Sequence, residues 1–199
     1  MLNYYIIDVE TTGLKVDWHE VTQVSIVRCS DRRQLNRYIR AEHPERCDDR
    51  ALEATGRTKD DLRKGGPKLE AVEACERFLL EDGQTPEHRC MVAHNAPFDK
   101  RFTSAMFKSV GKVLPVTCWL DTMRIMRYYA TRVLGLEKPS VKLHEALKIC
   151  GISPRDGAHN AISDTQNLYI LRDHLIKQGF DMLPYIKREA VASEEKDEE

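Results

Sequence analysis

Apolar residues in the first part of the chain occur in short runs separated by polar turns. Residues 3–9 are rich in tyrosine, isoleucine and valine, and residues 21–29 form a second run after a Thr-Thr-Gly turn. Residues 34–40 and 90–93 have the same character. Short apolar runs bounded by turn residues are typical of buried strands, so we expect strands at these positions.

Longer segments show the spacing of helices. The apolar positions Leu69, Val72, Cys75 and Leu79 recur every three or four residues, which predicts a helix from residue 69 to about residue 82. Similar patterns predict helices at about residues 99–110, 120–134, 141–150 and 160–178, and residues 42–66 are expected to be mostly irregular. Strands come first and helices later, which predicts an α/β fold with a mixed central sheet flanked by helices.

The length of the chain indicates one domain. A chain of 199 residues can bury a substantial core, and a length of this order usually forms one folded unit. After Ile186 the sequence becomes a run of charged residues with few apolar ones. We therefore expect a domain over residues 1–186 and a disordered, charged tail over residues 187–199.

Composition argues against several classes of protein. Apolar residues make up 41% and charged residues 32% of the chain, which is unlike a disordered or fibrous protein. No apolar run approaches the roughly 20 residues of a membrane-spanning helix, and the N-terminus lacks the basic segment of a signal peptide. The six cysteines form no Cys-x-x-Cys pair. We expect a cytoplasmic protein with reduced thiols and no membrane partner.

The net charge of −1 lacks the strongly basic balance of proteins that coat a nucleic-acid duplex. If the chain binds nucleic acid, it does so locally. Such local binding would depend on metal ions, and the candidate ligands for them are the acidic residues described next.

Two acids stand at the end of the first predicted strand. Asp8 and Glu10 are two residues apart, so alternation along a strand places both side chains on the same face. Neighbouring carboxylates repel one another unless a cation lies between them, and Mg²⁺ and Mn²⁺ prefer oxygen ligands. Gly13 allows a tight turn of the backbone beside this pair. By itself the pair could also cap a turn or face solvent.

A third acid, Asp99, follows the strand predicted at residues 90–93. Pro97 favours the start of a helix, which would place Asp99 in the first helical turn with its carboxylate near the strand ends. Taken alone, Asp99 could equally do no more than balance the helix dipole.

His159 and Asp164 precede and open the last predicted helix. Five residues on a regular helix correspond to about 140° of rotation, so the two side chains share a site only if His159 lies in the loop before the helix. Pro154 and Gly157 favour such a loop. A solvated histidine with no role in chemistry is the simpler interpretation of His159 on its own.

Together the three segments resemble the DEDDh exonuclease superfamily, which has a ribonuclease H-like fold and includes polymerase proofreading subunits, oligoribonuclease and RNase T. The motifs are Ile7-Asp8-Val9-Glu10-Thr11-Thr12-Gly13-Leu14, then His94-Asn95-Ala96-Pro97-Phe98-Asp99, and then His159 with four residues before Asp164. The related tyrosine subclass would carry tyrosine where Asn160 stands. The resemblance covers about residues 4–178, and it departs from the family in the second strand, at residues 20–25.

The resemblance implies a 3′-to-5′ exonuclease that acts on the 3′ ends of nucleic acid. Two Mg²⁺ or Mn²⁺ ions would be held by Asp8, Glu10, Asp99 and Asp164, with Asp8 bridging both, and His159 would accept the proton of the attacking water. The terminal nucleotide would contact the substrate-binding residues Thr11, Thr12, Gly13, Leu14 and Phe98. Single-stranded DNA is the favoured substrate, and RNA stays open because the chemistry is the same for both.

Several alternatives remain beside this hypothesis. Phe98 and Phe102 could belong to the core, and Trp18 could stack on a base or anchor its loop. A haloacid dehalogenase-type phosphohydrolase also begins with a strand ending in aspartate, but it would need a second aspartate where Glu10 stands. A binding or scaffold module without activity, a proofreading subunit with a polymerase partner, and a homodimer are further possibilities.

Overall fold

A mixed six-stranded sheet forms the centre of the domain, with strand order β3-β2-β1-β4-β5-β6. The computed structural model describes residues 1–155 and 160–189. The strands are β1 Asn3–Thr11, β2 Val21–Arg28, β3 Gln34–Tyr38, β4 Arg89–Ala93, β5 Cys118–Asp121 and β6 Ile186–Arg188. Strands β1, β4 and β5 run parallel to one another, whereas β2, β3 and β6 pair antiparallel with their neighbours. The α/β class with a mixed sheet is thus confirmed.

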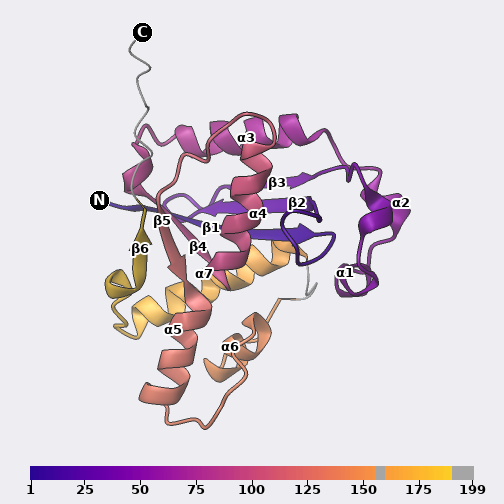
Figure 1. The fold of residues 1–199 in the computed structure, drawn as a ribbon. Helices are drawn as coiled ribbons and strands as arrows, with labels where there is room; N and C mark the ends of the chain where they lie inside the picture. The colour runs from indigo at the N-terminus through magenta and orange to yellow at the C-terminus, as the bar shows by residue number, and fades with distance from the viewer. Residues whose placement is uncertain (156–159, 190–199) are drawn as a thin grey trace.

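Helices cover both faces of the sheet (Figure 1). One face packs against α3 Lys68–Leu80 and α4 Ala96–Lys108, and the other against α5 Thr122–Tyr128, α6 Leu143–Ile149 and α7 Ala161–Lys177. Two short helices, α1 Asp49–Thr55 and α2 Lys59–Leu62, lie together at one side of the molecule. Within the described residues, no helix has both the length and the apolar character that crossing a membrane requires.

Alternation along β1 divides its side chains between the two layers. Tyr5, Ile7 and Val9 belong to the core cluster on the side of α3 and α4. Ile6 belongs to the cluster on the side of α7. Because side chains of a strand alternate between the faces, Asp8 and Glu10 share the face of Ile6 and point toward α7.

Three local expectations differ from the structure. A helix was expected from residue 120, but β5 occupies Cys118–Asp121 and the helix starts only at Thr122. A fully buried parallel strand lacks polar alternation, so its apolar run resembles the start of a helix. The expected helix does continue to Val133, but its last five residues, Tyr129–Val133, are π-helical. Residues 42–66 are more regular than expected because they contain α1 and α2.

The C-terminal strand changes the expected boundary of the domain. Ile186–Arg188 pairs with Cys118–Leu120 of β5, so the folded part extends beyond residue 186. The backbone N–H of Glu189 also donates to the carbonyl of Thr117 (2.9 Å). The remainder of the predicted tail, residues 190–199, lies outside the described residues.

Candidate active site

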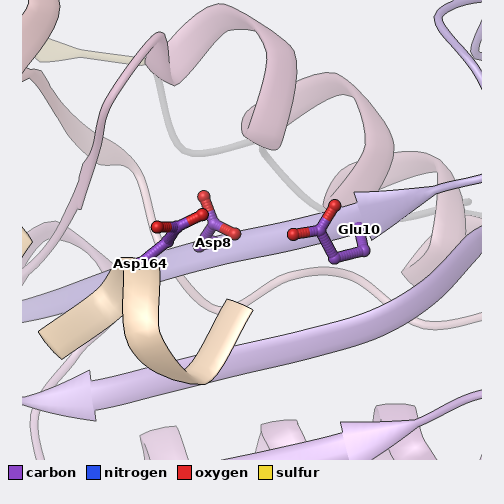
Figure 2. A group of neighbouring side chains, drawn as sticks. All are labelled: Asp8, Glu10 and Asp164. Carbon is purple, nitrogen blue, oxygen red and sulfur yellow. The ribbon is translucent and has the colours of Figure 1, made fainter. Parts of the chain in front are cut away.

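Three carboxylates converge between β1 and α7. Asp8, Glu10 and Asp164 each offer an oxygen atom, and these three oxygens lie within 4.8 Å of one another. Figure 2 shows Asp8 and Glu10 on the strand and Asp164 reaching toward Asp8 from the helix. The sequence predicted the shared face of Asp8 and Glu10, and the structure adds Asp164 to it. We call these residues the carboxylate cluster.

Polar contacts fix the beginning of α7 against the sheet. Asn160 caps the helix, because its side chain accepts a hydrogen bond from the backbone N–H of Ile162. The hydroxyls of Ser25 and Thr165 lie 3.0 Å apart, and Gln34 Nε2 donates to Thr165 Oγ1 (3.1 Å). Since Thr165 follows Asp164 directly, these bonds hold the Asp164 carboxylate over β1.

Asp99 lies beside the carboxylate cluster and holds β1 from the direction of α4. Its Oδ1 accepts a hydrogen bond from the backbone N–H of Val9 (3.3 Å), and only 3% of the residue is exposed. The pairing of β1 with β4 extends no further than Ile6 and Val92. Asp99 therefore bonds to a backbone group beyond the end of that ladder, in the first turn of α4 where the sequence placed it.

Burial and mutual repulsion raise the pKa of these acids. Burial contributes most to the raised pKa of Asp8, and the charges of Asp99, Glu10 and Asp164 add to it. Burial also raises the pKa of Asp99. Burial and Asp164 together raise the pKa of Glu10 to about 7, although the Arg57 guanidinium lowers it.

This electrostatic pattern fits a cation site. Buried carboxylates that repel one another lose that penalty when a divalent cation lies between them. The donors of the cluster are all carboxylate oxygens, the ligand type that hard divalent cations prefer. The residues present therefore suit a divalent metal.

Two residues near the cluster were not anticipated from the sequence. His144 of α6 places its Nε2 atom 3.6 Å from Asp164 Oδ1. Arg57, between α1 and α2, acts on the charge of Glu10. No local pattern marks either residue, because both reach the site only through the packing of separate helices. His159, the predicted proton acceptor, lies outside the described residues.

A hollow of about 290 Å³ adjoins the cluster, and we call it the terminal hollow. Its lining includes Glu10, Thr11, Gly13, Leu14 and Phe98, together with residues of α1. The Leu14 side chain is 75% exposed at this position. Four of the predicted substrate contacts thus surround one hollow. The fifth, Thr12, is buried, and its hydroxyl accepts a hydrogen bond from the backbone N–H of Glu20 (2.9 Å).

The aromatic residues near the site have different surroundings. Phe98 lines the terminal hollow and packs against Phe102, with their ring centroids 4.8 Å apart. Phe102 is buried in the core. The Arg46 guanidinium lies 4.3 Å from the centre of the Trp18 ring, so Trp18 anchors its loop to the segment before α1.

Gly13 is needed for the close packing of the loop that borders the terminal hollow. A β-carbon at this position would lie 2.5 Å from both Asp48 Oδ2 and His19 Nε2. We expect Gly13→Ala to lower the free energy of unfolding by about 1–3 kcal/mol, as overpacking usually does. Gly66→Ala is the control, because the nearest atom to its new β-carbon is 3.7 Å away. Urea denaturation measures both, and equal stability of the two variants would contradict the steric explanation.

The sequence is similar to an exonuclease family and to segments of bacterial DNA polymerases. The model of the exonuclease family RNase_T matches residues 5–171. The PolC-type DNA polymerase III of Halalkalibacterium halodurans is 28% identical over 148 residues, which make up 74% of this chain and 9% of the polymerase. The Bacillus cereus protein is 27% identical over 186 residues, covering 89% of this chain and 12% of the polymerase. The chain thus spans about a tenth of these relatives.

Solved structures share the fold. Exonuclease I of E. coli, in a zinc-bound complex with single-stranded DNA, matches with a TM-score of 0.74 at 19% identity, over 89% of this chain and 41% of that one. The nuclease domain of 3′hExo, a DEDDh family member bound to rAMP, matches with a TM-score of 0.73 at 14% identity, over 94% and 97% of the two chains. The predicted ribonuclease H-like fold is confirmed by these matches.

Proposed function

Because the chain belongs to the RNase T, or DEDDh, exonuclease family, we propose that it removes nucleotides from the 3′ end of a nucleic-acid strand. The observation that carries this proposal is the convergence of Asp8, Glu10 and Asp164 within 4.8 Å, on elements from opposite ends of the matched region. Hydrolysis of a phosphodiester bond needs positive charge near the phosphate oxygens and an oriented water molecule. The carboxylate cluster supplies ligands for that charge.

Two divalent cations, Mg²⁺ or Mn²⁺, are the cofactors that we propose for the site. Asp8 would contact both ions, Glu10 and Asp164 would complete one site, and Asp99 would act at the other or through water. When bound, such a pair of ions activates water and stabilises the leaving oxygen. Asp99 has a second task in this arrangement, since its bond to Val9 N–H keeps the end of β1 in place.

His159 is the proposed proton acceptor. An imidazole titrates near neutral pH, so it can accept a proton from the attacking water and release it afterwards. This role rests on the spacing of His159 and Asp164 and on the resemblance of that spacing to the family. Asn160, the next residue in the sequence, caps α7, the helix that carries Asp164.

The terminal hollow is the proposed site of the 3′-terminal nucleoside. Leu14 presents an exposed apolar surface against which a base or sugar can pack, and Phe98 borders the same hollow. Single-stranded DNA is the proposed substrate, with RNA as the second polymer to be tested. The structural relatives named above are bound to single-stranded DNA in one case and to rAMP in the other.

The test is a time course on 5′-labelled single-stranded DNA and RNA of one sequence, with Mg²⁺, with Mn²⁺ and with EDTA. We expect a ladder that shortens from the 3′ end when either metal is present and no shortening in EDTA. The polymer that shortens faster identifies the preferred sugar. Internal cuts without a ladder, or equal cleavage in EDTA, would reject the proposal.

A second candidate function is proofreading beside a DNA polymerase. The similarity to segments of PolC-type DNA polymerase III favours it. A proofreading enzyme removes an unpaired 3′ nucleotide faster than a paired one. We propose to compare matched and mismatched primer ends, alone and with a PolC-type polymerase. Equal rates on both ends under both conditions would reject this candidate.

A homodimer is the other partner that we propose to test, by light scattering.

A further inference from the structure

A second hollow, of about 330 Å³, lies next to the terminal hollow and has no role in the proposed reaction. We call it the outer hollow. It is lined by Gln23, Tyr38, Thr55, Arg57, Lys64 and Asn160, together with Asp61 and Gly65. Thr55 lines both hollows, so the two are neighbours on the surface.

The outer hollow continues a row of side chains that begins at the carboxylate cluster. Glu10 of β1 lies opposite Gln23 of β2, and Gln23 lies opposite Tyr38 of β3. Residues directly opposite one another in antiparallel strands point to the same face. The row therefore leads from Glu10 across the sheet to Tyr38, on the edge strand. Gln23 is buried and donates to Asn160 Oδ1 (3.3 Å), so Tyr38 is the exposed end of this row.

Tyr38 offers an aromatic surface that Arg57 supports. The tyrosine is 42% exposed, and the Arg57 guanidinium lies 5.2 Å from the centre of its ring. Arg57 donates to the carbonyl oxygens of Thr22 (3.4 Å) and Asp61 (3.2 Å). Both acceptors are uncharged, so these bonds hold the guanidinium without neutralising it. An aromatic ring beside a fixed cation is a surface on which a base can stack.

The charge of the outer hollow suits a phosphate group. Lys64 pairs with Asp61 at 2.9 Å, and its side chain is 73% exposed, which leaves donors available. The described lining contains two cations, Arg57 and Lys64, and one carboxylate, Asp61, so its net charge is +1. Asp61 is also bound by the N–H and hydroxyl of Thr58, which keeps it at the start of α2.

We propose that the outer hollow binds the nucleotide that precedes the 3′-terminal one. This inference rests on the exonuclease function proposed above. The base of that nucleotide stacks on Tyr38, and its 5′-side phosphate contacts Arg57 and Lys64. Stacking on one ring accepts any base, so this site favours an unpaired strand without reading its sequence. The enzyme then binds a strand of two or more nucleotides better than a single nucleotide.

The test compares two substrates that differ at this position. One is an unpaired oligothymidylate, and the other is the p-nitrophenyl ester of thymidine 5′-monophosphate, which lacks the base and 5′-side phosphate of the preceding nucleotide. We expect Tyr38→Ala to raise KM for the oligonucleotide about tenfold, in the range of one lost base stack, with kcat within about twofold. Hydrolysis of the ester stays unchanged, and Tyr38→Phe behaves as wild type.

Lys64 is tested through the salt dependence of binding. Lys64→Ala should reduce the slope of log affinity against log salt by about 1, the effect of one lost phosphate contact. Lys177→Ala is the matched control, because Lys177 is 74% exposed and also pairs with a carboxylate on its own helix, at 2.8 Å. Tyr128→Ala is the control for Tyr38, since Tyr128 is 47% exposed and lies on α5.

The outcomes separate the two proposals. An unchanged oligonucleotide KM in Tyr38→Ala, or an equal rise for oligonucleotide and ester, would overturn the outer-hollow site and leave the exonuclease function standing. If wild type hydrolyses neither substrate, the exonuclease function fails. In that case, fluorescence anisotropy of a labelled oligothymidylate in Ca²⁺ tests whether the outer hollow binds a nucleotide. Weaker binding by Tyr38→Ala than by wild type supports the outer-hollow site. Equal binding, or no binding by wild type, overturns it.

Discussion

Asp8→Asn is expected to lower kcat for metal-dependent exonuclease cleavage at least about a thousandfold. The contribution of metal ions to such a reaction is several kcal/mol, and each 1.36 kcal/mol is a factor of ten in rate. Asp8 is the acid on which three other carboxylates act, so it occupies the centre of the charge distribution. Asparagine keeps the shape of the side chain but removes the charge that holds the cations.

The measurement is the rate of single-turnover cleavage of 5′-labelled DNA in Mg²⁺ and in Mn²⁺. Asp173→Asn provides the control, because this carboxylate pairs with Lys177 near the other end of α7. His159→Ala should cost about 10² to 10⁴ in rate, the usual loss of a general base, and less than Asp8→Asn. Wild-type rates in purified Asp8→Asn with either metal would refute the proposed role of the cluster.

A divalent cation is expected to stabilise the protein strongly at pH 8 and weakly at pH 5. In the metal-free protein the pKa of Glu10 rises from 4.5 to about 7 on folding. The folded state therefore binds this proton more tightly than the unfolded state, and stability falls as pH rises from about 4.5 through 7. Above that range the cost reaches about 3 kcal/mol for Glu10 alone. A cation removes this cost when it binds.

Thermal unfolding between pH 5 and pH 8.5, in EDTA and in Mg²⁺ or Mn²⁺, measures this effect. At a metal concentration of about 100 Kd the gain is about 2.7 kcal/mol, which corresponds to roughly 5–10 °C in Tm. Glu10→Gln is the matched variant. Its metal-free Tm at pH 8 should exceed that of wild type, and its gain on adding metal should be smaller. A metal-induced shift that is the same at pH 5 and pH 8 would contradict the electrostatic account.

The sequence predicted the shared face of Asp8 and Glu10 because strand alternation is a strong local rule. Asp8 and Glu10 share a face in the structure for the reason that was given from their spacing. Asp164 reaches the same face as part of the last predicted helix. Both predictions follow from the periodicity of a single strand or helix. Each is correct if that segment is correctly identified as a strand or a helix.

The residue pattern of α4 alone could not predict the position of Asp99 relative to the other acids; only the resemblance grouped them. That position depends on where β1 and β4 stop pairing, after Ile6 and Val92, and the sequence does not show this point. The proximity of His144 to Asp164 depends in the same way on the packing of α6 beside α7. Tertiary packing between distant segments determines both arrangements, so no local sequence pattern predicts them.

The family match and the observed contacts favour some of the alternatives left open by the sequence over others. Membership of the exonuclease family disfavours a phosphohydrolase of the haloacid dehalogenase type. Trp18 is accounted for as a loop anchor by its contact with Arg46, and Phe102 as a core residue.

The strand β5 was missed because three buried apolar residues in a row have neither helical nor alternating spacing.

The carboxylate cluster joins β1, near the start of the domain, to α7, near its end. During synthesis β1 leaves the ribosome first and α7 much later, and α7 must dock before Asp164 meets Asp8. A partly made chain that ends before α7 therefore carries Asp8 and Glu10 but not Asp164. We expect metal binding at the cluster, and any activity that depends on it, only after α7 has docked.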